Sequence, residues 1–180
     1  MNAVAAEAGV SIGGIYRRFA SKEDLLRAIK DNVLARADDS QREIVETCRA
    51  KDLDGALSHY VRNRIASLRN YSGVMRQIFE GQNRDPIMEE RGRKSINVGM
   101  RTFRSVLSPF RDEIGHKDPE LAIETAFFIM NATFMRRVRT PISDLSFDHI
   151  DWDVLQAELL TVLKLYLKAR GDTRPRQPRK

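Results

Sequence analysis

The sequence predicts an all-α fold. Apolar residues recur at intervals of three and four along several long segments, which is the period of an amphipathic helix. Prolines, glycines and helix-capping residues separate these segments, and no segment has the pattern of a β-strand. A chain of 180 residues with 42% hydrophobic side chains is long enough to bury a core unaided. Its single cysteine, Cys48, excludes an intrachain disulfide framework and fits a reducing compartment.

The chain begins with two short predicted helices joined by a tight turn. Residues 4–8 are good helix formers, and Gly9 can adopt the positive φ that a sharp turn needs. Ser11 is placed to N-cap the second helix. Ile15 and Phe19 are four residues apart and should share a buried face with Val10.

The outer face of the second helix is polar and basic. Tyr16, Arg17 and Arg18 are left on that face when Ile15 points inward. Ser21 should cap the next helix, with Asp24 completing a shortened capping box. A very short helix with a small-residue start and an Arg/Tyr outer face is what recognition in the DNA major groove needs.

Six longer predicted helices follow. A continuous helix from residue 22 to about residue 49 would join the N-terminal unit to the remaining helices, although Asp38 and Asp39 are candidates for a bend. The others cover residues 53–68, 71–82, 87–107, 121–138 and 151–169, with a loop at residues 108–117. Pro86 and Pro119 suit first helical turns.

Residues 4–26 resemble the helix-turn-helix of TetR-type transcriptional regulators. The resemblance lies in the pattern Gly-Val-Ser-x-Gly-x-x-Tyr-x-x-Phe-x-Ser-Lys-Glu-x-Leu-Leu, which begins at Gly9 and ends at Leu26. It implies that residues 11–22 face double-stranded DNA. The candidate DNA-binding residues are Ser11, Ile12, Gly13, Gly14, Tyr16, Arg17, Arg18 and Lys22.

The side-chain chemistry divides these candidates by role. Tyr16 and Lys22 suit phosphate oxygens, and Arg17 is the first choice for a bidentate contact to guanine. Ile12 can touch a thymine methyl group, and Gly13 and Gly14 permit a close approach. Arg18 is either a phosphate contact or a solvated residue.

The resemblance also implies the domain organisation. We expect a DNA-binding head at residues 1–36, a ligand-binding and dimerisation body at residues 37–170, and a disordered basic tail at residues 171–180. The family's head has a further helix ahead of Val4, which this sequence lacks. Two alternatives follow: a start internal to a longer reading frame, which we favour, or a truncated regulator with weak DNA binding.

The last two helices are more apolar than one small domain needs. They are either core helices of a monomer or half of a four-helix homodimer interface, and the resemblance favours the homodimer. The candidate interface residues are Phe128, Met135, Trp152, Leu155, Leu159, Val162, Leu163 and Tyr166.

Aromatic and methionine side chains in the body form either a solid core or the lining of an apolar cavity. The resemblance implies a pocket there for a small apolar effector of unknown identity. The candidate ligand-binding residues are Tyr60, Met75, Phe79, Met100, Phe103, Phe127, Met130, Asn131 and Phe134.

Charge and motifs limit the other functions. The formal net charge is +6, but residues 168–180 hold most of it, so the local group Arg17, Arg18 and Lys22 is the better sign of DNA binding. No catalytic, metal-binding or cofactor-binding pattern, signal peptide or membrane span is visible, which predicts a cytoplasmic regulator. The alternative is a dimerisation and ligand-binding module that does not bind DNA.

Overall fold

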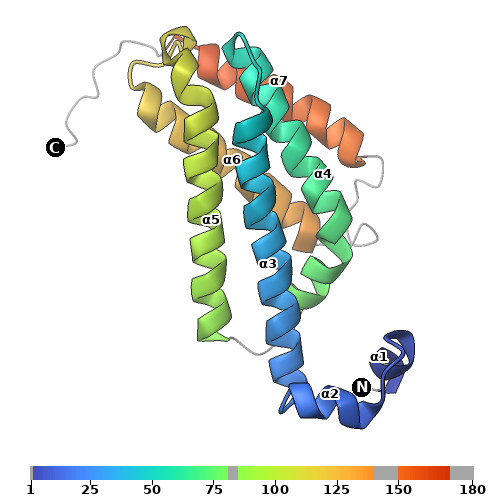
Figure 1. Cartoon of the computed structure of the whole chain (residues 1–180). Helices are drawn as coiled ribbons and strands as arrows, with labels where there is room; N and C mark the ends of the chain where they lie inside the picture. Colours follow the sequence, from blue (N-terminus) through green and yellow to red (C-terminus); the bar gives the residue numbers. More distant parts are fainter. Residues whose placement is uncertain (1, 81–84, 140–149, 171–180) are drawn as a thin grey trace, which may run out of the picture.

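The computed structural model describes residues 2–80, 85–139 and 150–170. All regular elements in these ranges are helical, as predicted, and they form a bundle with two short helices projecting from one end (Figure 1). In chain order the elements are α1 (Asn2–Glu7), α2 (Ile12–Arg18), α3 (Lys22–Thr47), α4 (Leu53–Glu80), α5 (Pro86–Leu107), the 3-10 helix η1 (Ser108–Glu113), α6 (Pro119–Arg139) and α7 (Trp152–Lys168).

Local capping explains where several helices begin. The Asp85 carboxylate accepts a hydrogen bond from the Ile87 amide (3.1 Å), and Pro86 lies in the first turn of α5. Asp118 accepts from the Leu121 amide at the start of α6 (3.1 Å). Asp151 accepts from the Asp153 and Val154 amides at the start of α7 (2.8 and 2.9 Å). These side chains satisfy backbone donors that have no partner within the helix.

Two predicted boundaries are wrong. The helices predicted at residues 53–68 and 71–82 are one continuous helix, α4, because no proline separates them. Gly73 destabilises a continuous helix by only about 1 kcal/mol. Starting a second helix would instead require the unfavourable nucleation of a new helical turn. The first part of the predicted loop, residues 108–113, is the 3-10 helix η1. Glu113 at its end accepts a hydrogen bond from the Leu53 amide (3.1 Å), so η1 also caps α4.

The hydrophobic core lies mainly between α4, α5, α6 and α7. Tyr60 and Phe103 are fully buried and pack edge to face with ring centroids 4.8 Å apart. Phe127 packs on Phe103 at 5.8 Å. In α3, by contrast, only Val33, Gln41 and Ile44 are buried.

The end of α7 is fixed by a backbone contact. The Gly115 amide donates a hydrogen bond to the Leu167 carbonyl (2.9 Å). A Cβ atom at position 115 would lie 2.4 Å from the Lys168 carbonyl oxygen, so only glycine fits this approach. The loop after η1 is thereby held against the last turn of α7.

Candidate nucleic-acid interface

The turn between α1 and α2 has the geometry of a Schellman motif. Gly9 has φ +64°, its amide donates to the Ala6 carbonyl (3.2 Å), and the Val10 amide donates to the Ala5 carbonyl (3.0 Å). The predicted role of Gly9 is confirmed. This turn redirects the chain, so α1 and α2 form a helix-turn-helix.

Ser11 caps α2 as predicted, accepting a hydrogen bond from the Gly14 amide at 3.0 Å. A Cβ atom at Gly14 would approach the Ser11 hydroxyl to 3.3 Å, so glycine leaves room for the cap. Ile12, Gly13 and Gly14 are exposed in the first turn. The tip of α2 is therefore small and open.

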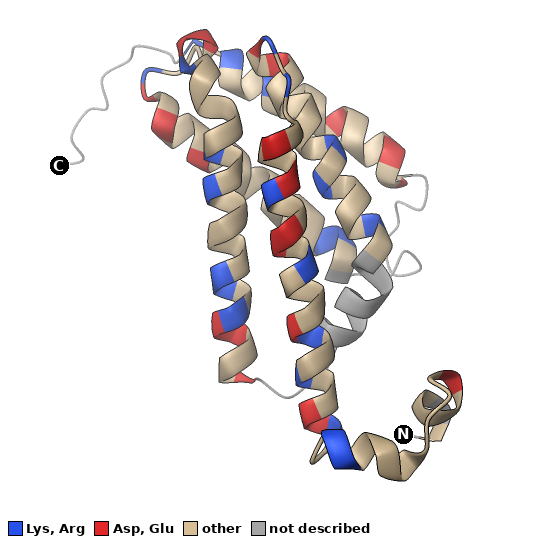
Figure 2. Cartoon of the chain, in the orientation of Figure 1, with Lys and Arg blue, Asp and Glu red and all other residues tan. Residues whose placement is uncertain are grey.

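The outward face of α2 is basic. Ile15 is buried, whereas Tyr16 is 48% exposed and Arg17, Arg18 and Lys22 are exposed. Among the described residues, these three cations form no ion pair with a carboxylate. Figure 2 shows the ribbon coloured blue for Lys and Arg where α2 meets α3. Their charges are available to an external anion.

The start of α3 is held by Ser21. Its hydroxyl accepts a hydrogen bond from the Asp24 amide (3.0 Å) and donates one to the Asp24 carboxylate (2.9 Å). The predicted cap is confirmed, although Asp24 binds the serine hydroxyl instead of closing the capping box through a backbone amide. The cap places Lys22 at the exposed start of α3.

Several apolar side chains of the head are exposed. Val10 was predicted to be buried beside Ile15 and Phe19, but it is 49% exposed because the turn directs it away from them. Val4 and Leu26 are also exposed, at 46% and 42%. A hollow of about 470 Å³ lies beside α3, at Phe19, Leu25, Ala28, Ile29, Asn32, Val33, Arg36 and Asn70.

The candidate ligand-binding residues form part of the packed core. Tyr60, Phe103, Phe127, Met130 and Phe134 are buried in it. Met100 and Asn131 are half-buried, and the side chains of Met75 and Phe79 lie outside the described residues. None of the seven candidates whose side chains are described lines the hollow beside α3 or the one on α5.

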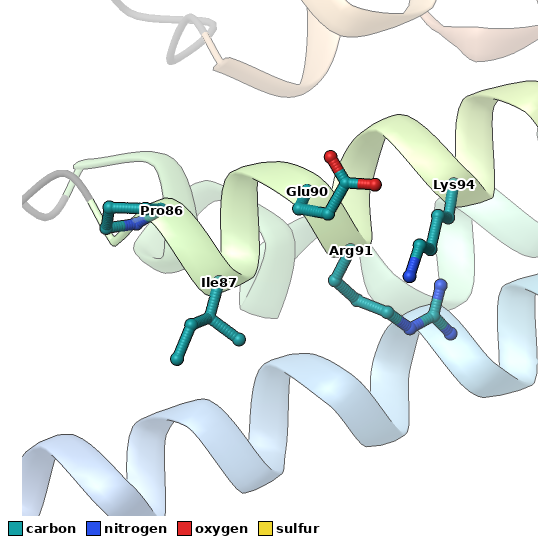
Figure 3. Close-up of a pocket in the computed structure, with 5 residues that line it drawn as sticks. All are labelled: Pro86, Ile87, Glu90, Arg91 and Lys94. Carbon is teal, nitrogen blue, oxygen red and sulfur yellow. The ribbon is translucent and has the colours of Figure 1, made fainter.

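A second hollow, of about 440 Å³, lies on α5 (Figure 3). It is lined by Pro86, Ile87, Glu90, Arg91 and Lys94. Ile87 and Arg91 extend toward α3, whereas the Glu90 carboxylate points away from it. The sequence analysis did not predict either hollow, because each depends on which helices lie side by side.

The candidate dimer residues divide into two groups. Leu159 and Leu163 are 5% and 0% exposed within the core of this chain, so their prediction as interface contacts is corrected. Phe128 and Val162 are exposed (72% and 50%). Met135, Trp152, Leu155 and Tyr166 are half-buried.

The structure also shows exposed apolar residues on α6 and α7 that are not among the candidate dimer residues. Leu121 on α6 is 50% exposed, and Val154 and Leu165 on α7 are 41% and 68% exposed. Leu121 precedes Phe128 by seven residues, or about two helical turns. Val154 lies eight residues before Val162, and Leu165 lies three residues after it. That spacing was the sequence signal that could have identified them.

Polar contacts join α3 to α5 in a polar seam. The seam comprises Arg27, Asp31, Asp38 and Gln41 of α3, Tyr60 of α4, and Asp85, Arg91, Ser95 and Gly99 of α5. The Arg27 Nε and Asp85 Oδ2 atoms are 2.6 Å apart. Arg91 contacts Asp31 and Asp38, in each case at 2.9 Å. The hydrogen bond from Arg27 is the main reason that the pKa of Asp85 lies below its usual value of 3.8.

The Asp85–Arg27 contact should make stability depend on pH in the acid range. Because the pKa of Asp85 is lowered by folding, its contribution is complete above about pH 4 and is lost as the pH falls through the folded-state pKa. Asp85→Asn keeps an N-cap but removes the titrating group. Urea unfolding between pH 2.5 and 7 should show wild type and this variant converging in stability below about pH 4.

The exposed Asp112 provides the control for this titration. Asp112→Asn keeps the Asp85–Arg27 contact, so its stability should still fall in the acid range as the contact is lost. A stability difference between wild type and Asp85→Asn that stays constant from pH 2.5 to 7 would contradict the assignment of this pH dependence to Asp85.

The described residues contain no group of three or more His, Cys, Asp or Glu side chains placed to hold a metal ion. Within the same ranges, no helix combines the length and apolar character needed to cross a membrane.

Comparison with known proteins identifies the N-terminal helices. Residues 1–29 match the family described as bacterial regulatory proteins, tetR family. Searches of curated proteins and of solved structures gave no match. The match covers α1, α2 and the first turns of α3, where the cap, the Schellman turn and the uncovered basic face lie. The N-terminal helix-turn-helix therefore matches the tetR family of bacterial regulatory proteins, which are DNA-binding transcription regulators.

Proposed function

We propose that the protein is a ligand-responsive repressor that binds a palindromic operator as a homodimer. The observation that carries this proposal is the basic surface formed by the outward face of α2 and the start of α3, where Arg17, Arg18 and Lys22 have no carboxylate partner among the described residues. Basic side chains on a helix-turn-helix bind DNA because they neutralise phosphates and reach base edges.

The exposed residues of the head have different roles in this proposal. Arg17 reads guanine in the major groove through its two-pronged guanidinium. Tyr16 and Lys22 hold phosphate oxygens, and Arg18 adds a further phosphate contact. Ile12, Gly13 and Gly14 allow the tip of α2 to approach the bases, and Ser11 orients that tip through its cap.

The exposed apolar faces of α6 and α7 support the homodimer. Phe128, Val162 and Leu165 are each at least half exposed, and a second copy would cover them. A twofold dimer presents two heads to half-sites about one helical turn of DNA apart, which explains the expectation of a palindrome.

The body is proposed to bind a small apolar effector. The aromatic and methionine residues of the core support an apolar ligand, which would enter by opening the packing around Phe103 and Met130. Effector binding then favours one of two body conformations.

We further propose that the head comprises residues 1–36 and the body residues 37–170. We also propose a cytoplasmic location and a role that is regulatory and not enzymatic. The proposed tail at residues 171–180 lies outside the described residues.

Two substitutions test the assigned DNA contacts. An operator is first selected from a pool of random-sequence duplexes. Arg17→Ala should then lower its affinity about 5- to 150-fold and relax the preference at one base pair, since a bidentate base contact is worth about 1–3 kcal/mol. Lys22→Ala should weaken all duplexes alike and reduce the slope of log K against log salt by about 1. Fluorescence anisotropy titrations at several salt concentrations measure both effects.

Arg42→Ala is the matched control, because Arg42 is an exposed arginine of α3 that pairs with Asp39. Its affinity should equal that of wild type. Equal, sequence-independent losses in the Arg17 and Lys22 variants would refute the division into base and phosphate contacts.

A second candidate function is a dimerisation and ligand-binding module that does not bind DNA. The exposed apolar residues Val4, Val10 and Leu26 in the head favour it, because they leave α1 and α2 poorly covered. A dimeric protein that enriches no sequence from the duplex pool would support this alternative.

A further inference from the structure

The helix that follows the DNA-contacting helix is held on the body mainly by polar contacts. α3 contains 26 residues, but only Val33, Gln41 and Ile44 are buried. α3 and α5 lie side by side and run in the same direction from the end of the body that carries the head (Figure 1). Apolar packing alone therefore constrains the position of α3 weakly.

The charged contacts of the polar seam lie on the first half of this interface. Arg27 reaches Asp85 at the start of α5. Arg91 bridges Asp31 and Asp38, which are seven residues, or about two helical turns, apart on α3. The Arg91 and Asp38 side chains are only 22% and 16% exposed, so solvent screens this pair less than an exposed pair.

The seam continues into the core through uncharged groups. Ser95 donates a hydrogen bond to Asp38 (2.6 Å). The Tyr60 hydroxyl lies 3.1 Å from both the Gln41 side-chain oxygen and the Gly99 carbonyl oxygen, so it joins α3, α4 and α5. A Cβ at Gly99 would make only ordinary contacts, 3.7 Å from the hydroxyl and 3.4 Å from the Phe127 ring, so the site is closely packed.

These contacts specify one register between the two helices. The Arg27–Asp85 and Ser95–Asp38 pairs span 58 and 57 residues of sequence. Arg91 lies between them and bridges Asp31 and Asp38, at separations of 60 and 53 residues, so all the contacts fit one parallel alignment of α3 and α5. Sliding or rotating α3 would leave Asp38, Arg91 and Gln41 without partners in a half-buried or buried environment, which is costly.

We propose that Arg27, Arg91 and Gln41 are positioning residues for DNA recognition, which act by fixing the register of α3 against α5. The head is attached to the first turn of α3, so this register determines where the head is held relative to the body. The proposal rests on the proposed DNA-binding function for its biological meaning. The inference that these residues fix the register does not depend on DNA binding, because the register can be measured without DNA.

The test is a distance measurement by pulsed electron paramagnetic resonance. Spin labels are attached at Glu23→Cys, in the first turn of α3, and Ser105→Cys, near the end of α5, in a Cys48→Ser background; both label positions are exposed. The double variant Arg27→Met with Arg91→Met removes both cations of the seam and keeps long side chains. The matched control is Arg42→Met with Arg93→Met, which removes ion pairs that lie within α3 and within α5.

We expect a single narrow distance distribution in the parent and the control. In the seam variant the distribution should shift or widen by at least about half a helical turn, or about 3 Å. Arg27→Lys with Arg91→Lys should restore the parent distribution, because the charges are retained. A merely stabilising role would lower the melting temperature of the seam variant without moving the distance, and that result would overturn the proposal.

If the double methionine variant loses its helical circular dichroism, Arg27→Met alone replaces it, and an unchanged distribution there overturns the proposal equally. Anisotropy titration of the same proteins with the selected operator separates the two proposals. A shifted distance in the seam variant, in a protein whose parent binds no DNA, would uphold the register and refute the proposed function.

Discussion

The variant Phe128→Glu should be a monomer at concentrations at which the wild-type protein forms the proposed homodimer. Phe128 is a 72% exposed phenylalanine on α6, and in a twofold interface it is buried twice. Each buried aromatic anchor of an interface contributes about 2–4 kcal/mol, and a buried, unpaired glutamate adds a desolvation penalty. The dimer dissociation constant should therefore rise at least about 1,000-fold, as measured by sedimentation velocity.

The loss of the dimer should also remove most of the operator affinity. Two linked heads bind two half-sites with an effective concentration that a single head lacks, so affinity should fall by about 100- to 10,000-fold. That loss exceeds the one expected for Arg17→Ala. The control is Ile96→Glu, which places the same charge at an exposed apolar position of α5. A Phe128→Glu protein that remains dimeric would show that the interface lies elsewhere.

The second large effect is expected for Phe103→Ala. Phe103 is fully buried, packs against Tyr60 and Phe127, and belongs to the set predicted to line an effector pocket. In a solid core, removing the ring leaves a cavity and lowers the free energy of unfolding by about 3–5 kcal/mol. Urea unfolding with the linear extrapolation measures this loss.

The size of the Phe103→Ala effect distinguishes a solid core from a ligand pocket. A ring that already borders empty space has fewer contacts to lose, and its removal should cost clearly less than about 3 kcal/mol. Phe103→Leu is the control, because it keeps most of the volume and should cost less than about 1.5 kcal/mol. We expect the large value, and a small value would favour a preformed pocket.

The sequence predicted the features whose causes are local. The turn at Gly9 and the caps at Ser11 and Ser21 depend on residues within a few positions, and each was found where the pattern indicated. The break predicted within α4 was wrong for the complementary reason. A short polar stretch without a proline does not end a helix that tertiary contacts support.

Features that depend on distant partners could not be predicted from the sequence. Helical spacing identified the apolar stripe of α7, but it could not show that Leu159 and Leu163 face the core of the same chain while Val162 and Leu165 face outward. The polar seam was missed because its partners are far apart in the sequence. In the sequence, nothing distinguishes Asp38 and Arg91 from charged residues on a solvated helix face. Their ion pair becomes evident only when α3 and α5 lie side by side in the structure.

The parallel arrangement of α3 and α5 has a consequence for the order of folding. Parallel helices cannot form a hairpin, so α4 must first run the length of the body before α5 can lie beside α3. The contacts between α3 and α5 in the seam join side chains 53 to 60 positions apart, whereas Tyr60 and Gln41 are 19 apart. Contacts of long sequence separation form late, and interfaces with little apolar burial open first. The segment that carries the proposed DNA-contacting face should thus be the last to dock and the first to detach, while the core of α4 to α7 stays folded.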